Sequence, residues 1–179
     1  MHQPSLPLAG PSTRWSEPSA TAKYCIFRCA DQQLALSATA TGELRLARSI
    51  VPVPASPPPL VGLCYGRGRF LPVIALQDLL QLAPPQPPQS QQTLIVLDNI
   101  SPWALLVTSV IAVDTLPGGG ALAAPVPAAA RAVAMGKAWY GDEPVLLLSP
   151  DRLLQVTHQM LADRWRASSA ASLPAAHRR

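Results

Sequence analysis

The apolar residues of this chain fall mostly in short runs that end at proline, glycine, aspartate or asparagine. Runs of this length, with alternating apolar and polar positions, predict β-strands. We expect hairpins within residues 24–36, 62–76 and 133–148, and strands within residues 44–53, 93–97 and 103–116. The 21 prolines agree with this interpretation because proline interrupts long helices. The pattern predicts an all-β chain.

Two segments have a helical pattern instead. Residues 77–82 form a short helix candidate that ends before a run of prolines. A longer helix is predicted from Ser149, where serine is a suitable N-cap, proline a suitable first residue and Asp151 an acid in the first turn. Its apolar face contains Leu153, Leu154, Thr157, Met160, Leu161 and Trp165. His158 on this helix is expected to face solvent.

Composition divides the chain into a central domain and two tails. Residues 1–23 are rich in proline, serine and alanine without periodicity and are expected to be disordered, and residues 167–179 form a basic tail. The domain between them, residues 24–166, contains a proline- and glutamine-rich stretch near residues 83–92. We expect this stretch to separate two halves of the domain. Residues 117–130 are expected to be a flexible loop.

The net charge of +4 comes from the residues outside 24–156. Residues 24–156 carry equal numbers of basic residues (Arg28, Arg45, Arg48, Arg67, Arg69, Arg131, Lys137, Arg152) and acidic ones (Asp31, Glu43, Asp78, Asp98, Asp114, Asp142, Glu143, Asp151). A nucleic-acid-binding domain would have its basic residues on the body. The charge pattern therefore does not favour nucleic acid as a partner.

Candidate chemistry is sparse in this sequence. Cys25, Cys29 and Cys64 are neither paired nor close to a histidine, so we expect small buried residues and no metal site. No acid pair, nucleotide loop or serine–histidine–acid set is evident, so neither a catalytic site nor a cofactor is predicted. The chain begins without a secretory segment, and its longest uncharged apolar run, residues 102–113, is too short to cross a bilayer. We expect a cytoplasmic protein.

One turn combines glycine with arginine. Residues 62–76 read as strand, turn and strand, and Gly66 and Gly68 flank Arg67. Glycine permits positive φ, so Arg67 is expected at a rigid, exposed tip. Two roles are open for it: docking a partner, or forming a local ion pair with Asp31, Glu43 or another acid.

The stretch resembles the signature of CheW-like domains, the coupling modules of chemotaxis. Matching residues are Gly62, Arg67, Gly68, Pro72, Val73, Ile74 and Leu76, while Tyr65 replaces an asparagine. The resemblance extends over residues 24–156 and includes a proline-bearing link before the signature and a closing hairpin with Gly136. Three aspartates of the pattern are replaced, by Ala75, Thr108 and Ser149.

This resemblance implies two SH3-like, five-stranded β-barrel subdomains that exchange strands, with a short internal helix and a C-terminal helix. It also implies a non-enzymatic adaptor that joins the cytoplasmic tip of a chemoreceptor (a methyl-accepting chemotaxis protein) to the regulatory domain of a CheA-type histidine kinase. The implied partner-binding residues are Arg67, Gly66, Gly68, Tyr65 and Arg69.

Two alternatives are open. A CheW-like scaffold can serve a signalling pathway other than chemotaxis. An SH3-like or oligonucleotide-binding module that reads nucleic acid would need exposed aromatic residues among basic ones. Phe27, Phe70 and Trp103 are expected to be buried, which argues against the second alternative.

Overall fold

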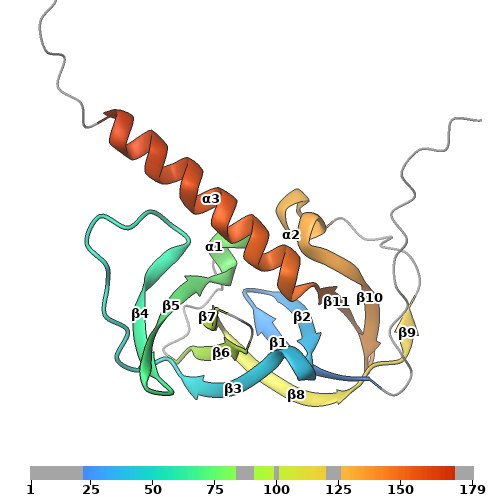
Figure 1. The fold of residues 1–179 in the computed structure, drawn as a ribbon. Coiled ribbons are helices and arrows are strands. Elements are labelled where there is room, and N and C mark those ends of the chain that lie inside the picture. The colour runs from blue at the N-terminus through green and yellow to red at the C-terminus, as the bar shows by residue number, and fades with distance from the viewer. Residues whose placement is uncertain (1–21, 84–90, 99–100, 120–125, 172–179) are drawn as a thin grey trace, which may run out of the picture.

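A computed structural model describes residues 22–83, 91–98, 101–119 and 126–171, and its strands form two sheets (Figure 1). The six-stranded sheet has the order β8-β1-β2-β11-β10-β9. The five-stranded sheet has the order β3-β6-β7-β5-β4. The strands are β1 (Lys23–Cys29), β2 (Gln32–Ser37), β3 (Thr41–Leu46), β4 (Leu60–Gly66), β5 (Arg69–Ala75), β6 (Thr93–Leu97), β7 (Trp103–Val107), β8 (Ser109–Thr115), β9 (Gly118–Gly119), β10 (Ala134–Tyr140) and β11 (Glu143–Leu148).

The predicted all-β fold with two SH3-like subdomains is confirmed, although one sheet has six strands because the short β9 joins it. The expected division near residues 83–92 does not separate the sheets. β6 and β7 follow that stretch but pair with β3 and β5, while β1 and β2 precede it and pair with β8 and β11. Each sheet therefore takes strands from both halves of the sequence, and the chain crosses between them after β2 and after β7.

Three apolar clusters explain why so many strands are apolar on both faces. One cluster includes Tyr24, Ile26 and Leu147 of the six-stranded sheet, and another includes Val73 and Val96 of the five-stranded sheet. The largest cluster takes the opposite faces of the same strands, among them Phe27, Ile74, Ile95 and Trp103. Alternate residues of β1, β5 and β6 thus enter different clusters. The two sheets are joined through this shared central core.

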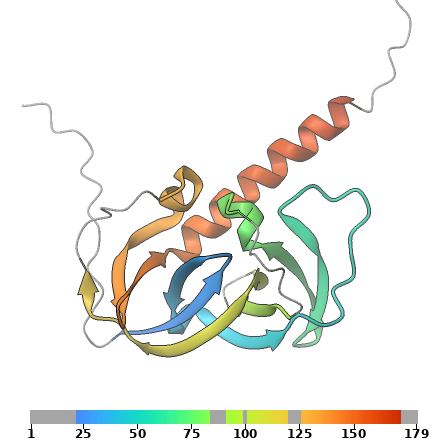
Figure 2. The ribbon, with the colours of Figure 1, turned by 180° about the vertical axis from the view of Figure 1, so that it is seen from behind.

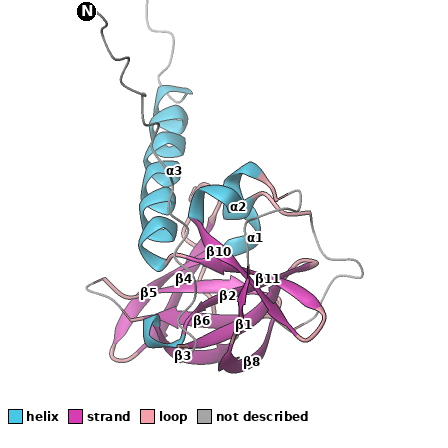
Figure 3. Cartoon of the chain, turned by 90° about the vertical axis from the view of Figure 1, so that its right-hand side faces the viewer, coloured by secondary structure: helices cyan, strands magenta, loops and turns pink. Residues whose placement is uncertain are grey.

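Helices cover one side of the strands (Figures 1 and 3). The helices α1 (Leu76–Leu80) and α2 (Ala128–Val133) contribute Leu76, Leu79 and Val133 to the central core. The long helix α3 (Pro150–Ala171) contributes Leu153 there, and its far end projects beyond the strands (Figure 2). No helix among the described residues is both long and apolar enough to span a membrane.

Several local predictions need correction. The loop expected over residues 117–130 contains β9 and the start of α2, because Ala130 and Val133 bury an apolar face that the alanine-rich sequence does not mark. The strand expected over residues 44–53 ends at Leu46, and only Val51 makes a further bridge, to Leu63. The sequence predicts the turn of the first hairpin at Asp31 and Gln32, but it lies one residue earlier, at Ala30 and Asp31.

The expected domain limits differ slightly from the ends of the elements. β1 begins at Lys23, and α3 continues to Ala171, past the limit expected at residue 166. Residues 1–21 and 172–179, most of the two expected tails, lie outside the described part of the chain.

Candidate functional site

The β4–β5 hairpin ends in a two-residue turn that places Arg67 at its tip. Gly66 pairs with Arg69, so Arg67 and Gly68 alone form the turn. Both have positive φ, 53° at Arg67 and 77° at Gly68, as a type I′ turn requires. The expected turn is confirmed, but Arg67 itself adopts the left-handed conformation that arginine ordinarily avoids.

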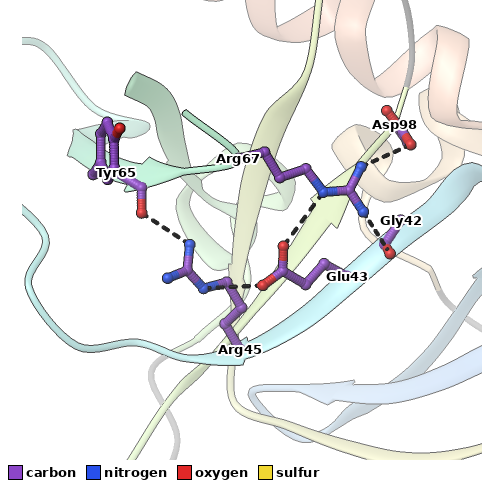
Figure 4. Close-up of polar contacts among 6 residues, drawn as sticks. All are labelled: Gly42, Glu43, Arg45, Tyr65, Arg67 and Asp98. Carbon is purple, nitrogen blue, oxygen red and sulfur yellow. Dashed lines mark hydrogen bonds and ion pairs between the residues drawn. The ribbon is translucent and has the colours of Figure 1, made fainter. Parts of the chain in front are cut away.

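The Arg67 guanidinium is held by three groups from other segments (Figure 4). Its Nη1 donates to Asp98 Oδ2 at 2.8 Å, its Nη2 to the Gly42 carbonyl oxygen at 2.8 Å, and its Nε to Glu43 Oε2 at 3.4 Å. The hydrogen bond to Asp98, with the charges of Asp98 and Glu43, raises the pKa of Arg67. The local ion pair that the sequence left open forms, with Glu43 and Asp98, while the docking role of Arg67 stays a prediction.

Arg45 on β3 makes a second link to the same hairpin (Figure 4). Its Nη1 donates to the Tyr65 carbonyl oxygen at 2.9 Å, and its Nε lies 3.3 Å from Glu43 Oε1. β3 and β4 are the two edge strands of the five-stranded sheet and do not pair with each other. Arg45 and Arg67 therefore connect these edges through side chains, with Glu43 shared between them.

Two glycines leave room for these guanidinium groups. A Cβ on Gly66 would lie 2.5 Å from Arg45 Nη1, and one on Gly42 would lie 2.8 Å from the Asp98 Cβ and 3.1 Å from Arg67 Nη2. A side chain on Gly66 would therefore displace the Arg45 guanidinium, and one on Gly42 would collide with Asp98 and crowd the Arg67 guanidinium. Gly68 has positive φ, but Gly66 does not. Gly66 therefore provides space for a side chain and not the positive φ that the sequence suggested.

Next to this network the hairpin exposes two aromatic rings. Tyr65 and Phe70 face each other across β4 and β5, with ring centroids 5.5 Å apart and planes at 66°. Their exposed fractions are 61% and 65%. The prediction that Phe70 is buried is wrong because the same face of β5 also carries the exposed Pro72, whereas Leu71 and Val73 point into the sheet's own cluster. Phe27 and Trp103 are buried as predicted.

All five residues predicted for partner binding lie at this hairpin tip: Tyr65, Gly66, Arg67, Gly68 and Arg69. Gly42, Arg45 and Asp98, which complete the network, were not predicted from the sequence. Glu43 and Asp98 stand 24 and 31 positions from Arg67, and β3 and β6 bring them together only by pairing. One feature of the sequence could have indicated the network: the charged residues Glu43 and Arg45 alternate with leucines along a strand.

Two of the three residues that replace aspartates, Thr108 and Ser149, accept a hydrogen bond from a backbone amide through their hydroxyl. The buried Thr108 Oγ1 accepts a hydrogen bond of 3.0 Å from the Ala30 amide in the first turn. Ser149 Oγ accepts one of 3.3 Å from the Arg152 amide and so caps α3, as predicted. Ala75 precedes α1 without a side-chain cap.

The three cysteines are free and buried, as expected. Burial raises the pKa of Cys25 to about 11 and that of Cys29 to about 12. For Cys64, burial also raises the pKa, while the charge of Arg45 acts in the opposite direction. Within the described residues, no three histidine, cysteine or acidic side chains lie close enough to hold a metal ion. His158 is exposed on α3, as expected.

Comparison with known proteins agrees with the fold. Residues 23–158 match the family model described as the CheW-like domain. The crystal structure of the scaffolding protein TtCheW from Thermoanaerobacter tengcongensis is similar with a TM-score of 0.61, at 20% sequence identity, over 72% of this chain and 84% of that one. No curated protein sequence matches the chain. Because the family model covers most of the chain and both sheets, this protein belongs to the CheW-like domain family.

Proposed function

We propose that this protein is a non-enzymatic adaptor of a chemosensory signalling system, acting in the cytoplasm. It joins the cytoplasmic tip of a chemoreceptor to the CheW-like regulatory domain of a CheA-type histidine kinase. Membership of the CheW-like domain family supports the general role, and the solved scaffold TtCheW has a similar fold. The observation that carries the proposal is the β4–β5 hairpin tip, which exposes two aromatic rings beside a fixed arginine network.

The five tip residues divide the work of docking. Tyr65 and Arg69 have exposed side chains and make contact with the partner, with Phe70 as a third contact residue. Aromatic residues and arginine supply most of the binding energy at many interfaces. Arg67 positions them: its guanidinium is bound to β3 and to Asp98, so it fixes the hairpin against its neighbour. Gly66 and Gly68 provide the space and the φ that this geometry needs.

The test is binding of the full chain to a receptor cytoplasmic fragment and to a CheA-type kinase from the same organism, measured by calorimetry. Tyr65→Ala and Arg69→Glu are expected to weaken association with at least one partner about tenfold or more, as loss of an interface anchor does. Trp139→Ala is the matched control because Trp139 is 43% exposed on β10 of the other sheet. Equal affinities for all variants would remove the hairpin tip from the docking surface.

Arg67→Glu tests the positioning role. The substitution places a carboxylate beside Glu43 and Asp98, so the hairpin should separate from β3 while the core stays folded. We expect weaker partner binding with little change in the thermal midpoint. An Arg67→Glu variant that is folded and binds both partners normally would show that the network has no part in docking.

A nucleic-acid-binding role is the second candidate, because the exposed pair Tyr65 and Phe70 lies beside Arg69. Aromatic rings next to basic side chains are typical of single-strand binding sites. Against this role, Arg45 and Arg67 share Glu43 and Arg67 also binds Asp98, which reduces the positive charge of the surface. Filter binding of a single-stranded oligonucleotide at low salt separates the two candidates. Retention that Tyr65→Ala abolishes would favour nucleic acid.

Affinity for receptors also separates the chemotaxis adaptor from a CheW-like scaffold of another pathway. A chemosensory adaptor should bind a methyl-accepting receptor fragment and a CheA-type kinase at once. A scaffold of another pathway should bind neither the receptor fragment nor a complex of receptor and kinase, even though its fold is the same.

A further inference from the structure

A cavity of about 370 Å³ lies where the two edge strands of the five-stranded sheet face each other. Arg45 and Leu46 of β3 line one side, and Cys64 and Tyr65 of β4 line the other. Arg48, from the segment after β3, completes the wall. The volume is within the range of sites that hold small ligands or a few side chains.

Arg48 gives this cavity an unbalanced positive charge. Glu43, the nearby acid, is bound by Arg45 and also by Arg67. In the part of the chain that the structure describes, the Arg48 guanidinium forms neither an ion pair nor a hydrogen bond; only its backbone amide is bonded, to Leu46. A guanidinium has five donors in a planar fork that fits a carboxylate. The wall of the cavity therefore offers an anion a cationic partner that needs no exchange of existing bonds.

The remaining walls indicate what accompanies the anion. Leu46 and Tyr65 are 50% and 61% exposed, and Cys64 at 3% forms a neutral, apolar floor. Ser49 adds a hydroxyl to the lining. Because β3 has only one neighbouring strand, its other edge keeps backbone donors and acceptors that an extended peptide can use. A peptide can use the positive charge, the apolar wall and the open strand edge together, whereas a small inorganic anion uses the charge alone.

We propose that this cavity binds an acidic, extended peptide segment of a partner protein. A glutamate or aspartate carboxylate of the segment binds Arg48, and a neighbouring apolar side chain packs on Leu46 and Tyr65. The site shares Tyr65 with the docking surface proposed above, but it differs in that Arg48 binds a single carboxylate between β3 and β4. It remains testable whether or not the hairpin tip binds the kinase or the receptor.

The test uses the full, isotope-labelled chain and two blocked dipeptides, N-acetyl-glutamyl-leucine amide and its glutaminyl counterpart. The glutamyl probe should give saturable shifts at the amide resonances of Leu46, Ser49 and Tyr65. Its affinity should exceed that of the glutaminyl probe roughly tenfold, as a hydrogen bond to a charged group gives. Because these probes are small, the result does not depend on any protein partner.

Arg48→Gln should remove the difference between the two probes. Arg131→Gln is the matched control because Arg131 is an exposed arginine on α2, away from this sheet. It should leave both affinities unchanged. The proposal is overturned if neither probe gives saturable shifts, if the two probes bind alike to the parent chain, or if Arg48→Gln still prefers the glutamyl probe.

Discussion

The hairpins β1–β2 and β4–β5 both turn through two residues, and in both a residue other than glycine has positive φ, 51° at Ala30 and 53° at Arg67. In the turn of β1–β2, Asp31 is exposed but Ala30 faces inward: Ala30 is 4% exposed, and its amide is bonded to the buried Thr108. The turn of β4–β5 faces outward and is bound through charged side chains. Turns of the same length thus have different roles: the first is anchored in the folded core, and the second exposes side chains at the surface.

The two hairpins differ in the groups that bind their turns. The Thr108 hydroxyl satisfies the Ala30 amide, so Ala30 can be buried in the first turn. A guanidinium is costly to bury, and its partners Glu43 and Asp98 are themselves part-exposed, so the second turn stays at the surface. The aromatic pair beside it then remains open to a partner protein. Substitutions in the two hairpins test this contrast between an anchored turn and an exposed one.

The largest effect is expected at the base of β4–β5, where the hairpin enters the core. Ile74 is 2% exposed in the central cluster, so Ile74→Ala should lower the free energy of unfolding by about 2–5 kcal/mol. Val73 of the same strand is buried in the cluster of the five-stranded sheet, and Val73→Ala should lower the free energy of unfolding by about 1 kcal/mol or more. Denaturant unfolding measures both.

Phe70→Ala, four residues from Ile74 in the same strand, is the matched control. Phe70 is exposed, and substitutions at the surface usually change stability by less than about 0.5 kcal/mol. If Phe70→Ala destabilises the chain as much as Ile74→Ala, the tip belongs to the core and the contrast fails.

The inward turn should be next in sensitivity. Thr108→Val removes the acceptor of the Ala30 amide and leaves that amide unpaired in a buried site, at a cost of about 1–3 kcal/mol. Thr108→Ser keeps the hydroxyl and should retain most of the stability. The Ala30 amide should also exchange its hydrogen much faster in the valine variant. Unchanged protection there would mean that this bond does not hold the turn.

These cases also show how far the sequence leads. Short apolar runs predicted the strands β5 and β6, and the glycine–arginine turn predicted the hairpin tip. The exposure of Phe70 was not predictable in this way, because an apolar residue next to a turn faces either solvent or core according to its register. The partners of Arg67 were hidden for another reason: β3 and β6 place Glu43 and Asp98 beside it through pairing of distant segments. Likewise, the exchange of strands between the two sheets follows from pairing of distant segments, so no short stretch of sequence indicates it.

Thiol reactivity gives a further distinction between the two hairpins. Burial raises the pKa of Cys29 to about 12, whereas at Cys64 the charge of Arg45 opposes the effect of burial. The thiolate is the reactive form, so a lower pKa gives more of it below that pKa. Cys64 should therefore react first with iodoacetamide in the native protein, and faster as the pH rises. Arg45→Gln should slow it. Peptide mapping identifies the labelled residue, and initial labelling at Cys29 would contradict the assignment.

The smallest effect on stability is expected for Arg67→Asn, and it separates structure from function most clearly. Asparagine accepts positive φ more readily than arginine, and Asn-Gly is a preferred type I′ turn, so the backbone of Arg67 and Gly68 is relieved. The bonds to Glu43 and Asp98 are lost, but exposed ion pairs contribute little to stability. The thermal midpoint should stay unchanged or rise, while binding to receptor or kinase weakens. That result would mean that arginine occupies an unfavourable backbone conformation because it positions the docking surface. A fall in the midpoint with normal binding would instead assign the network to the fold alone.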